Sequence, residues 1–402
     1  MRTLLRYLRP AALLALAAFS QGTGAAQGPA NWAEVEKAAR GQTVYFNAWA
    51  GDATINRYIA WASDEVQRRY GVKLVLVKVS DIAEAVARLQ AEKAAGRTTG
   101  GSIDLMWING ENFASLKAAG LLYGPWVDTL PNARLLDATD PTQATDFTVP
   151  TAGLEMPWGG ARFTFFYESA AIPSAPPRTP ADLLAWIRAH PGRFAYPRPP
   201  DFIGTSFLKQ LLLLLATDPA RLQRPVATDF DSITQPLWAW LDAAHPHLWR
   251  SGRAFPRSSP EQRRLLGDGE VDWLLSFNPF EAARAIRARE LSASIKGLHF
   301  SQGALGNSHF LAIPFNSSAS TGARVVANFL LSPEAQARKA DPAHWGDPTV
   351  LSLASLGAAD RARFGRGEQD SATPAPVRLL PEPHPSWTTA LERAWSLRYG
   401  AR

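Results

Sequence analysis

The sequence contains no cysteine among its 402 residues. Disulfide bonds, thiol catalysis and cysteine-ligated zinc are therefore excluded. A chain of this length can bury a large hydrophobic core and does not need cross-links to hold it. With 46% hydrophobic and 19% charged residues, the composition is that of a globular protein of one to three domains.

Long apolar runs are also missing, since both Ala11–Phe19 and Leu211–Ala216 are too short to span a bilayer. The first of these follows a start with three arginines and precedes the small residues Gly24–Ala26. This order predicts a secretory signal over residues 1–26 and a periplasmic mature protein. The alternative is an ordinary N-terminal helix.

Excess charge is small, because the formal net charge of +6 falls to +3 once the three arginines of the signal are removed. There is no dense Lys/Arg patch, so a nucleic-acid partner is not expected. The sequence also lacks a phosphate-binding loop, an HExxH motif and a GxSxG nucleophile elbow. These absences favour a protein that is not an enzyme and that uses neither a cofactor nor a metal.

What the chain does contain is an alternation of strand-like and helix-like segments. Thr43–Phe46, Val72–Val79 and Ile103–Ile108 read as buried strands, and helical periodicity follows each of them. Such alternation predicts an α/β protein with a parallel sheet flanked by helices. Further along, Ala161–Tyr167 and Phe194–Tyr196 are predicted strands.

Polar and aromatic residues gather where these segments end. Ligands of open parallel sheets bind beyond the carboxyl ends of the strands. Asn, Ser and Thr can hydrogen-bond a ligand there, and Trp and Phe can stack on a flat or cationic one. The candidates are Asn47, Trp49, Gly51, Asp52, Asn109, Glu111, Asn112, Trp158, Gly159, Thr205, Ser206, Asn278 and Phe280.

Most of these candidates also have a structural explanation. Asn47, Asp52 and Thr205 fit helix capping as well as ligand binding. Trp49 fits packing at the rim of a sheet. Asn278 stands before a proline and fits a turn. The coincidence of several such residues at strand ends, rather than any one of them, indicates a binding site.

Several long segments resemble the bacterial extracellular solute-binding proteins of ABC importers. They are TVYFNAWAGDATINRYI, IDLMWINGENF, WGGARFTFFYES, FAYPRPPDFIGTSFLKQLL and GEVDWLLSFNPFEAARAI, together with the signal. The resemblance covers most of the mature chain. It is strongest to the branch that binds thiamine, iron and polyamines, and within it to a thiamine-transporter-like subgroup.

The resemblance implies an α/β, two-lobed periplasmic binding protein fold of type II, each lobe a mostly parallel sheet flanked by helices. The implied lobes are residues 27–155 plus about 279–335, and residues 156–278 plus part of the C-terminal region. The ligand would lie in the cleft between them, and hinge closure would present both lobes to an inner-membrane permease. The implied protein is a monomer.

The candidates divide between the two implied lobes, with those up to Asn112 on the first and those from Trp158 to Asn278 on the second. The strands implied to connect the lobes are Phe163–Tyr167 and Phe310–Pro314. No Tyr-Tyr pair occurs, which counts against iron. Trp49, Trp158 and Phe280 could supply stacking rings, which favours a thiamine-like or other cationic heterocycle.

Two other functions remain open at this stage. One is an exported hydrolase or transferase that uses the carboxylates of Asp52, Glu111 and Glu155. The other is a ligand-sensing protein that docks to a receptor. The missing enzyme motifs favour transport over catalysis, and nothing in the sequence separates transport from sensing.

Overall fold

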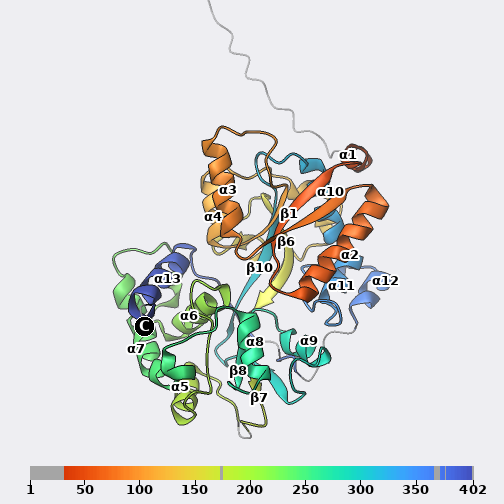
Figure 1. The fold of residues 1–402 in the computed structure, drawn as a ribbon. Coiled ribbons are helices and arrows are strands. Elements are labelled where there is room, and N and C mark those ends of the chain that lie inside the picture. Colours follow the sequence, from red (N-terminus) through yellow and green to blue (C-terminus); the bar gives the residue numbers. More distant parts are fainter. Residues whose placement is uncertain (1–30, 173–174, 366–371, 376, 401–402) are drawn as a thin grey trace, which may run out of the picture.

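The computed structural model describes residues 31–172, 175–365, 372–375 and 377–400. The predicted signal at residues 1–26 lies outside them. Figure 1 shows two bodies of helices and strands, one above the other, and two strands that run from one to the other. These strands are β6 (Glu155–Arg162) and β10 (Ala304–Ala312).

The larger body is built on a sheet in the order β11-β10-β3-β1-β2, with β6 on the free side of β10. The strands β1, β2 and β3 are parallel, as predicted, whereas β10 runs antiparallel to β3 and β6. The carboxyl ends of β1, β2 and β3 therefore point toward the smaller body (Figure 1). The bounds are Thr43–Trp49 for β1, Lys73–Val79 for β2, Leu105–Ile108 for β3 and Leu379–Leu380 for β11.

Helices of the larger body follow from caps and apolar spacing. The side chain of Asp52 accepts a hydrogen bond from the Thr54 N–H and starts α2, and Gly71 ends it with φ +67°. Ile55, Tyr58 and the apolar residues one turn apart beyond them are buried against the sheet. The helices are α1 (Trp32–Ala39), α2 (Ala53–Tyr70), α3 (Ala83–Ala94), α4 (Glu111–Ala118), α10 (Ser320–Leu330), α11 (Pro333–Ala340) and α12 (Ala358–Arg361).

The smaller body has a three-stranded sheet in the order β8-β7-β9. Both neighbours pair antiparallel with β7, so the expectation of a mostly parallel sheet is wrong here. β7 enters directly from β6, and β8 and β9, which are joined through α9, both run opposite to it. The elements are β7 (Thr164–Glu168), β8 (Trp273–Ser276), β9 (Ile295–Leu298), α5 (Pro180–Ala189), α6 (Phe202–Leu215), α7 (Phe230–Ala244), α8 (Ser259–Gly267), α9 (Glu281–Arg287) and α13 (Ser386–Tyr399).

Two further expectations differ from the structure. The predicted strand Phe194–Tyr196 is irregular, although its three side chains are buried. The segments that connect the bodies are β6 and β10, whereas Phe163–Tyr167 falls mostly in β7, inside the smaller sheet. Since β9 also pairs with β7, the chain returns to the larger sheet at β10, later than residue 279. The lobe bounds themselves stay a prediction.

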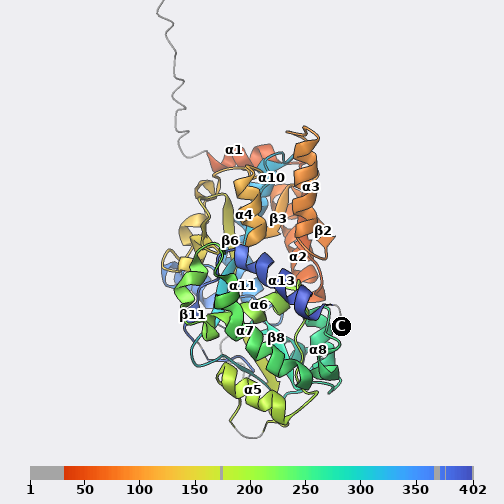
Figure 2. The same cartoon turned by 90° about the vertical axis from the view of Figure 1, so that its left-hand side faces the viewer.

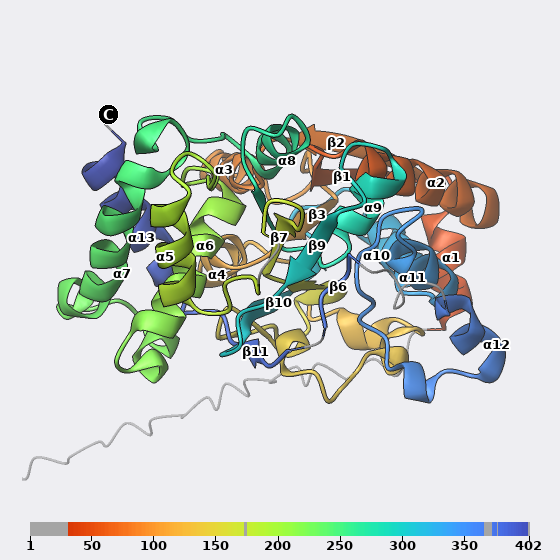
Figure 3. The same cartoon turned by 90° about the horizontal axis from the view of Figure 1, so that it is seen from below.

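Each body has its own hydrophobic core. One core holds Phe46, Tyr58 and Trp158 of the larger body, and another holds Phe165, Phe207 and other side chains of the smaller one. Seen from the side, α13 lies beside α6 and reaches the level of the larger body (Figure 2). From below, β7, β9 and β10 lie between α5–α7 and α9–α11 (Figure 3). No helix within the described ranges is both long and apolar enough to cross a membrane.

Candidate functional site

The site begins where β3 ends and α4 starts. Gly110 has φ +64°, a conformation that L side chains rarely adopt, and its N–H donates a 2.6 Å hydrogen bond to the Asp146 carboxylate. A Cβ on Gly110 would lie 2.8 Å from the ring of Phe147. A glycine is therefore needed here for both the backbone conformation and the close approach of that ring.

Asp146 and Phe147 belong to a hairpin of β4 (Thr145–Asp146) and β5 (Val149–Pro150). Its two-residue loop is Phe147-Thr148, with φ +43° and +74°. Loops of this kind prefer Asn and Gly, because a bulky or β-branched residue at positive φ costs about 1–3 kcal/mol. Such strain persists where the surroundings require it. Here the loop conformation places the Phe147 ring close to Gly110.

From the smaller body, Lys209 of α6 faces the same hairpin. Its ammonium donates a 2.7 Å hydrogen bond to Glu382 Oε2 and lies 4.2 Å from the centroid of the Phe147 ring. Glu382 follows β11, and its Oε1 accepts a 2.7 Å hydrogen bond from Asn307 Nδ2. Both side chains of the ion pair are nearly fully buried, at 2% and 3% exposure.

Further carboxyl groups complete this region. Glu155 of β6 is buried, and electrostatic effects link it to Asp146 and Asp146 to Glu111. Glu392 of α13 accepts a 2.9 Å hydrogen bond from Thr205 Oγ1, and α13 contacts α4 of the other body. We call this set the acidic junction; its members are Glu111, Asp146, Glu155, Lys209, Glu382 and Glu392.

The acidic junction has many hydrogen-bond acceptors and few donors. Both carboxylate oxygens of Glu155 and Oδ1 of Asp146 are buried and have no hydrogen-bond partner among the described residues. The same holds for Oδ1 of Asn307. Buried polar atoms normally have a partner, so these acceptors call for a donor from outside the described chain.

Burial strongly perturbs these acids. It raises the pKa of Asp146 and of Glu155 well above the usual range, against the Gly110 N–H that lowers it at Asp146. Burial also raises the pKa of Glu111, and the nearby Glu382 adds to the rise. For Glu392, burial and then Glu111 outweigh the Thr205 hydrogen bond and raise the pKa to about 7. Without a cation the junction therefore favours protonated carboxyls.

A second charged group joins the two bodies at the start of α2. Asp52 Oδ2 lies 2.9 Å from Arg284 Nη2 and 3.5 Å from Arg263 Nη1. Both arginines also pair with Glu281, and Arg284 donates a 3.2 Å hydrogen bond to Thr54 Oγ1. Burial would raise the pKa of Asp52, but the Arg284 charge, the Thr54 N–H and Arg263 outweigh it and lower the pKa. We call Asp52, Arg263, Glu281 and Arg284 the arginine cluster.

The sequence-derived candidates are therefore only partly brought together. Glu111 and Thr205 lie at the acidic junction, and Glu111 Oε1 accepts a 3.3 Å hydrogen bond from Asn112. Asn109 follows β3 directly and is half-buried. Asp52 has its own partners in the arginine cluster and caps α2, so its oxygens are already engaged.

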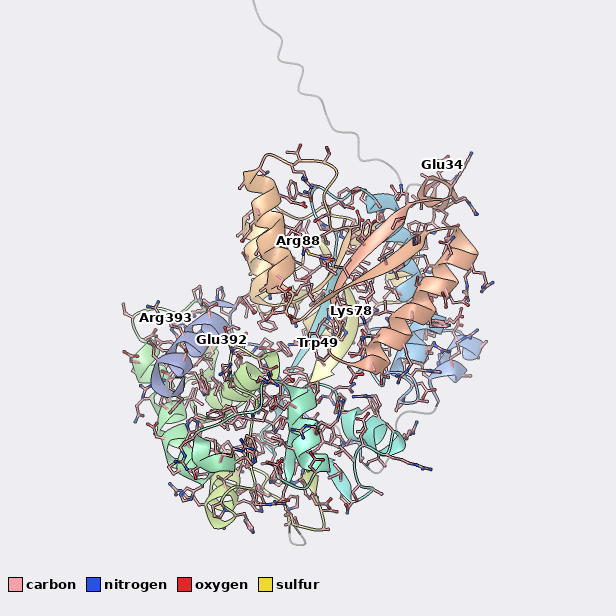
Figure 4. The ribbon with its side chains drawn as sticks, in the orientation of Figure 1. Glu34, Trp49, Lys78, Arg88, Glu392 and Arg393 are labelled. Carbon is pink, nitrogen blue, oxygen red and sulfur yellow. The ribbon has the colours of Figure 1, made fainter. Side chains whose placement is uncertain are left out.

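Candidates on β1 lie at the edge of the region. Asn47 is fully buried, and its amide has no partner among the described residues. Strand register places Asn47 in one row with Glu155, with β3 and β10 between them. Trp49 is half-buried at the end of β1, close to the smaller body (Figure 4), and its ring packs on Gly51.

Other candidates have structural roles. Trp158 is completely buried in an aromatic core with Trp107 and Trp345, 5.2 Å from each, rather than at the junction of the bodies. A Cβ on Gly159 would collide with His309 and Asp347 of the same core.

The remaining candidates belong to the smaller body. Oδ1 of Asn278 accepts a 2.8 Å hydrogen bond from the Phe280 N–H. This is the hydrogen bond of a turn, in agreement with the structural explanation for Asn278. Phe280 is half-buried and packs near Gly346. Ser206 is buried within α6, and its Oγ has no partner among the described residues.

Sequence reasoning missed four members of the junction: Asp146, Lys209, Glu382 and Glu392. Lys209 was hidden in an apolar helix, where a single lysine reads as a surface residue. Glu382 lies in the Pro-rich part of the C-terminal region, and Glu392 lies in the helix that ends it, where a single acidic residue reads as part of a solvated face. The sequence held one signal for Asp146. The two-residue loop that follows it, Phe147-Thr148, contains neither Gly nor Asn, which is unusual for a hairpin.

Comparisons with known proteins agree with the fold. The family model described as bacterial extracellular solute-binding protein matches residues 61–358. "Protein YnjB" of Escherichia coli (strain K12) is 48% identical over 386 residues, which is 96% of this chain and 97% of that protein.

Similar solved structures include the periplasmic binding protein AfuA from Actinobacillus pleuropneumoniae with bound fructose-6-phosphate. It has a TM-score of 0.64 and 11% identity, over 90% of this chain and all of that one. A putative spermidine/putrescine ABC transporter from Listeria monocytogenes has a TM-score of 0.61 and 14% identity, over 89% of this chain and 98% of that one. The likeness shows the two-lobed α/β fold of type II periplasmic binding proteins. The chain belongs to the bacterial extracellular solute-binding protein family.

Proposed function

We propose that the protein is the periplasmic solute-binding component of an ABC importer that captures a small organic cation at the acidic junction and delivers it to a membrane permease. A thiamine-like heterocyclic cation is the leading candidate. The observation that carries the proposal is Glu155, whose two buried carboxylate oxygens have no hydrogen-bond partner among the described residues.

The charge balance supports a cationic ligand. The acidic junction holds five carboxyl groups and one ammonium, that of Lys209; outside it, the Lys117 ammonium, which donates to the Pro150 carbonyl, also acts on Glu155. Isolated carboxylates are costly to bury, and a bound cation would stabilise their charged form. No group of three or more His, Cys, Asp or Glu side chains in the described part of the chain is arranged to hold a metal ion. An organic cation with N–H donors fits this surplus of acceptors.

Aromatic rings near the junction fit the same ligand class. Phe147 and Phe202 both lie near the Lys209 ammonium, at 4.2 and 5.8 Å from ring centroid to nitrogen, and Phe202 is 41% exposed. Trp49 offers a further half-buried ring near the boundary of the two bodies. Faces of such rings attract organic cations.

The family and the similar structures are transport solute-binding proteins, which speaks against the exported hydrolase considered from the sequence. Transport also predicts that the ligand is recovered unchanged after binding. The sensing alternative differs in its membrane partner, so deletion of the permease rather than of a receptor should abolish uptake.

The test is a titration of the mature protein with thiamine, followed by Trp fluorescence and calorimetry. Glu155→Gln should weaken binding at least about tenfold, the effect of a lost charged hydrogen bond. The same variant should raise the thermal midpoint of the unliganded protein, because it removes a buried carboxyl and breaks no hydrogen bond. A glutamate with only a structural role would not both weaken ligand binding and raise the thermal midpoint when it is replaced.

The matched control is Asp64→Asn on the exposed side of α2, which should change neither quantity. If neither thiamine nor simple alkylammonium ions bind to the folded wild-type protein, cation capture is wrong. If cations bind but thiamine does not, only the thiamine assignment fails.

A further inference from the structure

Lys209 has the surroundings that proteins provide for a bound organic ammonium ion. Its nitrogen lies 2.7 Å from Glu382 Oε2, 4.2 Å from the Phe147 ring centroid and 5.8 Å from that of Phe202. A carboxylate together with aromatic faces is a recurrent setting for such cations. Here the cation is part of the protein, and its side chain is almost fully buried, at 2% exposure.

We propose that Lys209 occupies one cationic position of the acidic junction, so that the protein selects a ligand with a single charged centre and discriminates against diamines. This inference rests on the proposed function, because it assumes that the ligand is an organic cation. It assigns to Lys209 the role of a specificity-determining residue.

The hydrogen bonds of the acidic junction divide it into two halves. On the side of the smaller body, both oxygens of Glu382 are engaged, one by Lys209 and one by Asn307. On the side of the larger body, both oxygens of Glu155 and one of Asp146 have no partner among the described residues. The carboxyl groups of Glu155 and Asp146 can therefore accept a further positive charge beside them. The charge of the Glu382 carboxylate is already balanced by the Lys209 ammonium.

A diamine would bring two ammonium groups to this arrangement. With its first ammonium at the carboxyls of the larger body, the second would still feel the charge of Lys209, which acts on Asp146, Glu111 and Glu392 alike. Like charges brought together in a buried setting repel, and such repulsion is a common means of rejecting a related ligand. A cation with one charged centre avoids this repulsion.

The hairpin loop supports an organised position for the Lys209 ammonium. Phe147 is held at φ +43° next to Thr148 at φ +74°, an arrangement that neither residue prefers. The absence of a side chain at Gly110 permits the Phe147 ring to lie against that glycine while its face meets Lys209. Strain of this kind concentrates at ligand sites.

An ordinary structural ion pair between Lys209 and Glu382 would account for the same distances. The two explanations differ in what they predict for selectivity. A structural pair affects all ligands alike, whereas a built-in cation changes the preference between one and two ammonium groups.

The experiment compares 1-aminobutane with 1,4-diaminobutane, which share their carbon chain and differ by one amine. Dissociation constants are measured by calorimetry for wild type and for Lys209→Met. Wild type should bind the monoamine at least as tightly as the diamine. The substitution should shift the ratio of the two constants toward the diamine by about tenfold or more, the effect of one charged hydrogen bond.

Two further variants make the result specific. Lys209→Arg keeps the positive charge and should retain the wild-type preference. Lys209→Met combined with Glu382→Gln removes the carboxylate that the second ammonium would meet, so the gain for the diamine should disappear. If Lys209→Met alone is too unstable for calorimetry, the rise of its thermal midpoint with each amine gives the same comparison.

An unchanged ratio in Lys209→Met, with amine binding still measurable, would overturn the inference and leave the proposed function intact. A gain that persists in the double variant would also overturn it. If wild type binds neither amine nor thiamine, the proposed function fails, and the inference fails with it.

Discussion

Cation binding at the acidic junction should depend steeply on pH, because burial shifts the carboxyl groups that would hold the cation toward their protonated form. Glu392 is the member with a pKa of about 7, raised from 4.5 by burial. The charged groups that face it are Glu111 and Asp81, which raise its pKa further, and Lys209, which lowers it; Thr205 donates the hydrogen bond. A cation stabilises the ionised form, so affinity must rise with pH through this value.

The magnitude follows from the pKa of Glu392. With a pKa of about 7, about one tenth of the Glu392 carboxyls are ionised at pH 6 and about nine tenths at pH 8. If binding requires the carboxylate, the association constant for a permanent cation such as thiamine increases about tenfold over this range. The other junction carboxyls are shifted in the same direction and can only steepen the increase.

The assay is calorimetry of thiamine binding at pH 6, 7 and 8 in two buffers that differ in ionisation enthalpy. The difference between buffers counts the protons released, and about half a proton should come from Glu392 at pH 7. Glu392→Gln should lower the affinity at pH 8 and remove about tenfold of the pH dependence. Asp64→Asn should leave the profile unchanged.

An affinity that is flat or falls between pH 6 and 8, with no proton release, would refute the reasoning. The unliganded protein offers an independent check on the same groups. A carboxyl whose pKa is higher in the folded state stabilises the protein fully below its unfolded pKa and loses that contribution as pH rises through the folded value. The thermal midpoint of the unliganded protein should therefore fall between pH 5 and 8, and saturating thiamine should reduce this fall.

Two further predictions concern the backbone at the site and the contact between the bodies. Gly110→Ala should destabilise the protein by about 1–2 kcal/mol more than Gly120→Ala in urea denaturation, because both have positive φ but only Gly110 faces a ring, that of Phe147. Equal effects would contradict the close approach. Arg284→Met should cost on the order of 3 kcal/mol, since it removes a partner of Asp52 at a site where both side chains are 8% exposed. Adding Asp52→Asn should restore part of the loss, and simple additivity would show that the pair is not coupled.

Local chemistry determined much of the framework. Short apolar runs and the helical spacing that follows them identified the first three strands and their helices, because these segments must bury apolar side chains. Asp52 was recognised as the cap of α2 for the same local reason. The capping interpretation of Thr205 is wrong, because α6 starts at Phe202 with Asp201 as its cap, four residues earlier. The strand end at Asn109 pointed to Glu111 as a candidate, and its role in binding stays a prediction. These features depend on neighbours within a few positions in the chain, so a single sequence contains them.

Only the tertiary structure decided which charges meet. Glu382 and Glu392 come from the far end of the chain, and Lys209 comes from an apolar helix of the other body, so no spacing rule connects them with Glu111. The antiparallel direction of the smaller sheet comes from the pairing of β7 with β8, which is far away in the chain, so no local pattern records it. The positive φ of Phe147 arises against local preference, because contacts with Gly110 and Lys209 outweigh it. Electrostatics and packing act through space, and sequence patterns record only what acts along the chain.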